Sequence, residues 1–186
     1  MPTSAKKIVV LDRDGVINVD SDAYIKSPDE WVALPGALEA IARLTQAGYR
    51  VAVATNQSGI GRGLFDMNAL NAMHLKMHKM VAAAGGRIDA VFFCPHTAED
   101  QCECRKPKPG MLKMITERFE NDPEETPCVG DSLRDLQAAA ALGFIPHLVL
   151  SGKGQKTLAA GGLPEGTIVH ADLRAFALDF LSEEHE

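Results

Sequence analysis

Short apolar runs, most of them rich in β-branched residues, alternate along this chain with segments whose apolar residues repeat every three or four positions. Such short runs predict buried strands, and the longer segments predict amphipathic helices. Their alternation is typical of βα units around a parallel sheet. The predicted strands are Ile8–Leu11, Val51–Ala54, Ala90–Phe93, Pro127–Val129, His147–Leu150 and Ile168–Val169. We therefore expect an α/β fold, a Rossmann-like three-layer α/β/α sandwich with a mainly parallel central sheet.

The segments between the strands predict helices and one long loop. Asp66 can cap a helix that ends near Ala84, and its stripe of Leu70, Met73, Met77 and Met80 is expected to pack in the core. The other predicted helices are Gly36–Ala47, Gly110–Phe119, Leu133–Leu142 and Leu173–Leu181. Residues 13–35 have few periodic apolar positions, and a loop of that length is often functional. Residues 56–105 leave no room for an inserted lid, so we expect no cap domain.

Length and charge restrict the class of protein. A chain of 186 residues suits one domain, here residues 1–186, and a net charge of −6 argues against a nucleic-acid surface. No run approaches the roughly 20 apolar residues of a membrane helix, and Met1–Lys7 lacks the apolar region of a signal peptide. We expect a cytoplasmic protein without membrane or nucleic-acid partners. No long apolar surface stripe is left over, which favours a monomer.

Carboxylates follow two of the predicted strands. Asp12 and Asp14 come directly after the first strand, and Asp131 follows the fourth. The carboxyl edge of an open α/β sheet is where ligands bind, and Asp12 with Asp131 can ligate Mg²⁺ through oxygen. The alternatives are an ordinary acidic turn and a helix N-cap. Asp135 can support the site or simply favour the first turn of its helix.

Two further segments can bind an anion. Ala54-Thr55-Asn56-Gln57-Ser58-Gly59 offers a hydroxyl, an amide and backbone N–H groups at a strand end, which suits phosphate as well as an ordinary turn. Arg105-Lys106-Pro107-Lys108-Pro109-Gly110 places two cations beside prolines, which suits an anion site as well as a solvated basic turn.

A cysteine-rich segment predicts a second metal site. Cys94, His96, Cys102 and Cys104 offer three thiolates and an imidazole within eleven residues, a closed set for a structural Zn²⁺. Redox cysteines or simple packing are the alternatives. The zinc would aim Arg105 and the next residue at a phosphate. His74 and His78 lie four residues apart without a third ligand in view, so we assign them no metal.

The order Asp-x-Asp, Thr-Asn, Arg-Lys-Pro and Gly-Asp-x-x-x-Asp resembles the haloacid dehalogenase superfamily of phosphotransferases, over nearly the whole chain. The resemblance implies that Asp12 is the nucleophile and Asp14 the general acid and base. It also implies that Mg²⁺ binds Asp12, Asp131 and the backbone carbonyl of Asp14. Phosphate oxygens would be held by Thr55, Asn56 and Lys106.

The zinc loop without a cap resembles one branch of that superfamily, which contains heptose 1,7-bisphosphate 7-phosphatases and histidinol-phosphate phosphatases. The segments Leu11–Asp20, Thr55–Gly63 and Arg105–Met111 look more like the heptose enzymes, so the resemblance implies a small phosphorylated sugar as substrate. Its contacts are expected from Asp20, Ser21, Asp22, Ala23, Gln57, Ser58 and Arg105. Alternatives are a histidinol-phosphate phosphatase, a nucleic-acid 3′-phosphatase, which would need a basic groove, and a non-catalytic zinc module.

Overall fold

The computed structural model describes residues 6–184 and has one six-stranded sheet, in which every pairing is parallel. Its order is β3-β2-β1-β4-β5-β6, the order of a Rossmann sheet. The strands are β1 (Ile8–Leu11), β2 (Arg50–Asn56), β3 (Ala90–Cys94), β4 (Pro127–Gly130), β5 (Ile145–Val149) and β6 (Ile168–His170). The predicted fold class is confirmed. The statement about a signal peptide falls largely on residues outside the described range.

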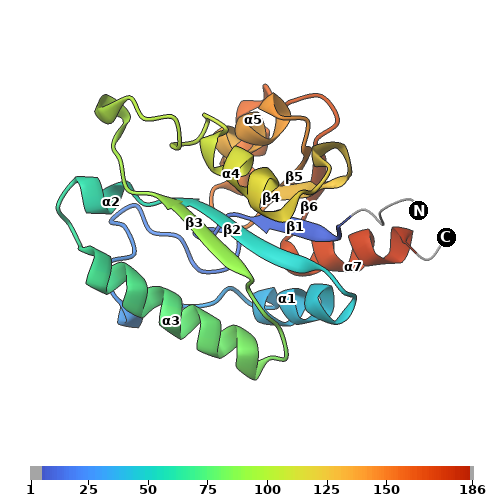
Figure 1. Cartoon of the computed structure of the whole chain (residues 1–186), viewed down its shortest axis with the longest axis horizontal. Helices are drawn as coiled ribbons and strands as arrows, with labels where there is room; N and C mark the ends of the chain where they lie inside the picture. The colour runs from blue at the N-terminus through green and yellow to red at the C-terminus, as the bar shows by residue number, and fades with distance from the viewer. Residues whose placement is uncertain (1–5, 185–186) are drawn as a thin grey trace.

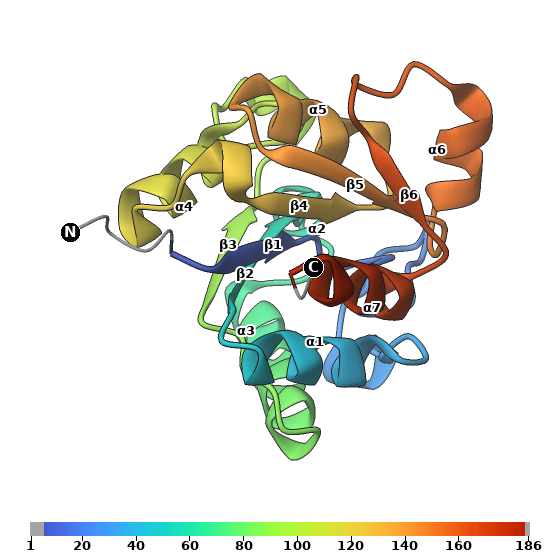
Figure 2. The same ribbon diagram turned by 90° about the vertical axis from the view of Figure 1, so that its right-hand side faces the viewer.

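Helices cover both faces of the sheet (Figures 1 and 2). They are α1 (Ala37–Gln46), α2 (Ser58–Gly61), α3 (Met67–Ala83), α4 (Gly110–Phe119), α5 (Leu133–Ala141), α6 (Gly154–Ala160) and α7 (Leu173–Glu183), with 3-10 helices η1 (Pro28–Glu30), η2 (Ala98–Asp100) and η3 (Pro123–Glu125). Among residues 6–184, no helix combines the length and apolarity needed to cross a membrane.

The side chains of β1 alternate between two apolar cores, as the period of a strand requires. Val9 and Leu11 pack with α1, α3 and α7 on one face, whereas Ile8 and Val10 pack with α4 and α5 on the other. Both faces of the central strand are therefore buried, which explains why its sequence is a continuous apolar run rather than an alternating one.

The predicted helix after Asp66 is confirmed. The Asp66 carboxylate accepts a hydrogen bond from Ala69 N at 2.9 Å and caps α3. Leu70, Met73 and Met77 are buried, and Met80 packs against the same core. The methionine stripe is therefore core, as expected.

The long segment between β1 and α1 is anchored to the core. It buries Val16, Ile17 and Trp31 completely, and Leu34 N donates to Ile17 O at 2.9 Å. The segment thus holds its polar residues at a fixed place beside the sheet.

Besides shifts of a few residues at strand ends, the short helices α2 and α6 and the three 3-10 helices are not among the sequence predictions. The fifth strand begins at Ile145 rather than His147, because Ile145 N pairs with Thr126 O at 3.0 Å and Pro146 is tolerated next to the strand start. Helix α6 was not predicted, because only Gly154 in it is buried and its sequence lacks the periodic apolar residues that indicate an amphipathic helix.

Candidate active site

The carboxyl ends of β2, β1 and β4 are neighbours at one edge of the sheet. Leu11 pairs in register with Val53 on one side and Val129 on the other, so the residues that follow these strands emerge together. A pocket of about 230 Å³ opens at this edge. Of the predicted site residues, it is lined by Asp12, Asp14, Asp20, Ser21, Asp22, Thr55, Asn56, Gln57, Ser58, Arg105, Lys106 and Asp131. Predictions from distant parts of the sequence thus converge on one pocket.

Ala23 is the one predicted substrate contact outside this set. Ala23 is not among the described residues that line the pocket. Its N–H donates to Ser21 Oγ at 3.1 Å. Its N–H therefore serves the turn that places Ser21.

Three carboxylates crowd the floor of the pocket. One oxygen from each of Asp12, Asp131 and Asp135 lies within 4.8 Å of the others. Burial, reinforced by the charge of Asp135, raises the pKa of Asp12 to about 7. Burial and the charge of Asp12 raise the pKa of Asp131 to about 8. An oxygen-only donor set with excess negative charge fits a hard divalent cation such as Mg²⁺.

The backbone around Asp131 leaves no space for added side chains. A Cβ on Gly15 would lie 2.1 Å from Asp131 Oδ2, and a Cβ on Gly152 would lie 2.4 Å from the same atom. Lys153 N donates to that oxygen at 2.9 Å. Two loops thus fix the Asp131 carboxylate where it faces Asp12. The side chain of Asp14 lies outside the metal-ligand cluster, and its contribution through the backbone carbonyl stays a prediction.

Lys106 is the cation on the pocket floor. Its side chain is 6% exposed, and Nζ lies 3.2 Å from Asp12 Oδ1, 2.6 Å from Asp135 Oδ1 and 2.8 Å from Ala54 O. Burial by itself lowers the pKa of Lys106, but the charges of Asp12 and Asp135 outweigh it and raise that pKa above its usual range. Lys106 is therefore held charged. Asp135 also forms a capping box with Ser132 at the start of α5. It therefore both contacts the pocket cation Lys106 and stabilises the first turn of its helix.

The side chain of Asn56 holds the Lys106 backbone. Its Oδ1 accepts from Lys106 N at 3.0 Å, and its Nδ2 donates to Lys106 O at 3.2 Å. This paired contact connects the end of β2 to the loop that carries the cation. The neighbouring Thr55 hydroxyl is buried and accepts a hydrogen bond from Gln57 Nε2 at 3.0 Å.

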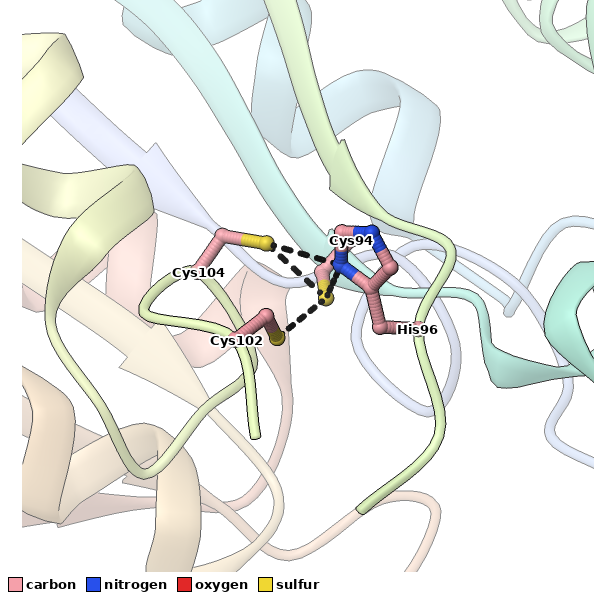
Figure 3. Close-up of side chains that lie close together, drawn as sticks. All are labelled: Cys94, His96, Cys102 and Cys104. Carbon is pink, nitrogen blue, oxygen red and sulfur yellow. Dashed lines mark hydrogen bonds between the residues drawn. The ribbon is translucent and has the colours of Figure 1, made fainter. Parts of the chain in front are cut away.

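The predicted zinc ligands come together at the end of β3 and in the loop that follows it (Figure 3). Cys94 Sγ lies 3.6 Å from Cys102 Sγ and 3.1 Å from Cys104 Sγ, and His96 Nδ1 lies 3.5 and 3.4 Å from Cys94 and Cys104 Sγ. A tetrahedral Zn²⁺ with ordinary bond lengths would space sulfurs by about 3.8 Å and sulfur from nitrogen by about 3.5 Å. The chain's own ligand spacing therefore fits zinc.

The zinc-ligand cluster borders the cationic side of the pocket. Arg105 directly follows Cys104, and its Nη1 donates to His96 O at 3.4 Å. Gly61 N donates to Pro95 O at 2.9 Å, which brings α2 against the same loop. A metal bound here would fix Arg105 at the pocket rim.

The sequence did not single out three other cations that line the pocket: Arg62, Arg134 and Lys153. They lie in loops or at helix termini, where no pattern marks a basic residue as functional. In the part of the chain that the structure describes, Arg62, Arg105 and Arg134 have no ion-pair partner, whereas Lys153 Nζ lies 3.6 Å from Asp20 Oδ2. The rim therefore offers three guanidinium groups to an anion.

Among residues 6–184, His74 and His78 belong to no cluster of three or more potential metal ligands. His74 is buried and its Nε2 lies 3.1 Å from Arg13 Nη1, whereas His78 is exposed.

Relatives share this sequence over nearly its full length. A curated D-glycero-beta-D-manno-heptose-1,7-bisphosphate 7-phosphatase from Bordetella bronchiseptica is 61% identical over 177 residues, 95% of this chain and 99% of the relative. A protein of the same name from Neisseria meningitidis is 56% identical over 179 residues, 95% of this chain and 96% of the relative.

Solved structures are similar over the same extent. The crystal structure of D,D-heptose 1,7-bisphosphate phosphatase from B. bronchiseptica, complexed with magnesium and phosphate, has a TM-score of 0.94 at 61% identity, and the match covers 95% of this chain and 99% of that one. The Burkholderia thailandensis D,D-heptose 1,7-bisphosphate phosphatase has a TM-score of 0.78 at 73% identity, with the same shares covered. The family model of haloacid dehalogenase-like hydrolases matches residues 4–143. The chain belongs to the haloacid dehalogenase-like hydrolase family.

Proposed function

We propose that this chain is a Mg²⁺-dependent phosphatase that removes the 7-phosphate of D-glycero-D-manno-heptose 1,7-bisphosphate and leaves heptose 1-phosphate, for ADP-heptose and lipopolysaccharide core precursors. The observation that carries the proposal is the pairing of Asp12, in contact with the charged Lys106, with a second carboxylate, Asp14, in one pocket. The relatives named above support the choice of substrate.

Asp12 is placed to act as the nucleophile. Its Oδ1 accepts from Arg13 N at 2.8 Å and lies 3.2 Å from Lys106 Nζ, which leaves Oδ2 for attack on phosphorus. A new Asp12 O–P bond forms as the bond between phosphorus and the sugar oxygen breaks. Mg²⁺, held by Asp12, Asp131 and the carbonyl of Asp14, supplies positive charge that offsets the repulsion between carboxylate and phosphate. Thr55, Asn56 and Lys106 hold the phosphate oxygens, where charge is spread.

Asp14 carries the protons. In the first step it gives a proton to the departing sugar oxygen, and in the second it takes one from the water that attacks the aspartyl-phosphate. Inorganic phosphate leaves, and Asp12 is restored. The side chain of Asp14 is partly exposed, with 23% of its surface accessible, so it can reach both groups.

The pocket rim suits a second phosphate. A bisphosphate carries an anion away from the reacting group, and a forked guanidinium such as Arg105 can hold it with two hydrogen bonds. Arg62 and Arg134 also lack ion-pair partners among the described residues. Histidinol phosphate instead carries an amine and no second anion, so this rim favours the bisphosphate. Asp20, Ser21, Asp22, Gln57 and Ser58 line the pocket and would contact the sugar.

Further properties are proposed together with this function. Zn²⁺ bound by Cys94, His96, Cys102 and Cys104 would be structural, and residues 1–186 would form one phosphatase domain with the zinc loop near 94–104. The protein acts as a cytoplasmic monomer on a small sugar phosphate, without nucleic-acid or membrane partners. The four cysteines are free of disulfides, as a reducing compartment favours.

Phosphate release from heptose 1,7-bisphosphate, histidinol phosphate and a 3′-phosphorylated oligonucleotide tests the proposal. We expect the highest kcat/KM for the bisphosphate, and loss of turnover in Asp12→Asn. A higher kcat/KM for either other substrate would contradict the assigned substrate. Substantial turnover by Asp12→Asn would contradict the assigned nucleophile.

A further inference from the structure

Arg13 is a buried cation between the two catalytic aspartates in the sequence. Its side chain is 0% exposed, and it is among the largest fully buried side chains of the described chain. Its Nε donates to Asp14 Oδ1 at 2.9 Å, and Nη2 lies 2.8 Å from the same oxygen. Asp14 is its only ion-pair partner within residues 6–184. A buried guanidinium strongly resists separation from its carboxylate, so Asp14 is held in one orientation.

The far end of the guanidinium contacts α3. Arg13 Nη1 lies 3.1 Å from Nε2 of His74, which is itself buried. Burial, with the nearby charge of Arg13, lowers the pKa of His74 to about 4. His74 is therefore neutral at physiological pH, and its Nε2 accepts the hydrogen bond from Nη1. This contact fixes the rotation of the guanidinium around its long side chain.

The two oxygens of Asp14 consequently differ. Oδ1 accepts from Arg13 Nε and from Asn18 Nδ2, both at 2.9 Å, so its lone pairs are occupied. Within the described part of the chain, Oδ2 accepts one hydrogen bond, from Gln57 Nε2 at 3.2 Å. Because Oδ1 already accepts two hydrogen bonds and Oδ2 accepts only one, a proton on Asp14 resides on Oδ2. The proton to be transferred thus has one defined atom.

We infer that Arg13 and His74 are positioning residues that fix Asp14 so that Oδ2 alone exchanges protons with the leaving oxygen and the attacking water. This inference rests on the proposed function, which makes Asp14 the proton carrier. Neither side chain touches the reacting atoms. Both act through the Asp14 carboxylate. If the side chain at position 13 only filled space, an apolar residue would suit it better, because the attraction within a buried ion pair often does not repay the cost of removing both charges from water.

The test compares two substrates of the same phosphatase. Heptose 1,7-bisphosphate releases a poor leaving group that needs a proton, whereas p-nitrophenyl phosphate releases a phenolate that leaves without one. The parameter kcat/KM covers the steps up to departure of the leaving group. His74→Leu, which removes the acceptor, is expected to lower kcat/KM for the bisphosphate about tenfold. For p-nitrophenyl phosphate the change should stay within about twofold.

Controls separate positioning from general damage. His74→Gln offers a side-chain oxygen in place of Nε2 and should restore the bisphosphate rate, and His78→Leu, at an exposed position on the same helix, should change neither rate. If His74→Leu does not fold, Arg13→Lys keeps the charge but lacks the second arm toward His74, and the same selective loss is expected. Equal losses on both substrates, or no loss on either, would overturn the inference.

Asp14→Asn distinguishes a failure of this inference from a failure of the proposed function. Asp14→Asn should lower the ratio of kcat/KM for the bisphosphate to kcat/KM for p-nitrophenyl phosphate, and by more than His74→Leu does. If Asp14→Asn leaves the ratio unchanged, Asp14 is not the proton donor and the proposed mechanism is wrong. If Asp14→Asn lowers the ratio and His74→Leu does not, only the positioning role is wrong.

Discussion

Replacing Gly15 with alanine should inactivate the enzyme with only a moderate loss of stability. Gly15 has a φ of +83°, and its added Cβ would lie 2.1 Å from Asp131 Oδ2, a contact that real Cβ atoms do not make below 3.0 Å. Asp131 must therefore move by at least about 0.9 Å, since the gap has to grow from 2.1 to 3.0 Å. A misplacement of about 1 Å can cost about 10²-fold in rate. We expect a loss of that size in kcat/KM at saturating Mg²⁺, together with weaker Mg²⁺ binding.

Gly48→Ala is the matched control. Gly48 has a φ of +89°, but nothing lies within 4 Å of its added Cβ. Gly48→Ala therefore shares with Gly15→Ala only the backbone strain of about 1–2 kcal/mol. For a chain of this size, that strain lowers Tm by about 2–8 °C. The assay measures thermal unfolding and Mg²⁺-dependent phosphate release for both variants. Full activity in Gly15→Ala, or an equal loss of activity in Gly48→Ala, would refute the reasoning.

Three further predictions concern charge, zinc and pH. Lys106→Met should lower kcat about 10²-fold, because it removes the cation beside Asp12; steady-state kinetics should show it, and an unchanged kcat would contradict the role. Cys104→Ser should abolish the bound zinc seen by elemental analysis and raise KM for the bisphosphate about tenfold, whereas an unchanged zinc content would exclude this ligand set. Burial lowers the pKa of His147 to about 4, so the unfolded chain binds its proton first as pH falls. The free energy of unfolding should therefore decrease from about pH 6.5 to 4, by about 3 kcal/mol from this residue. Urea unfolding of His147→Leu should show a flatter pH dependence than the parent.

The sequence predicted the central strands well because β1, β2 and β4 bury nearly continuous apolar runs. Leu11, Val53 and Val129 are fully buried and lie in register, so the polar residues after each strand could be expected to meet. The pocket residues at those strand ends were predicted for the same reason. Because neighbouring strands are parallel and in register, the residues that follow them lie close together.

What the sequence could not predict depends on tertiary contacts. An arginine between two aspartates is usually solvated, and nothing local indicates that Arg13 is buried against His74, sixty-one residues away. The double role of Asp135, as a helix cap and as the partner of Lys106, follows from how α5 meets the loop after β3. Arg62 and Arg134 lie at the rim because α2 ends and α5 begins there.

The tight anchoring of residues 13–35 to the core has a consequence for the fate of the phosphoryl group. Trp31 and Ile17 hold this segment beside the sheet, so it is not free to fold over the pocket. Under the proposed mechanism, we expect water to reach the aspartyl-phosphate once the sugar has left. Water is then the most abundant acceptor, and another alcohol could compete only if the pocket bound it strongly. A site of this kind is committed to hydrolysis. Phosphoryl transfer to a second sugar should stay negligible even at high concentrations of that sugar.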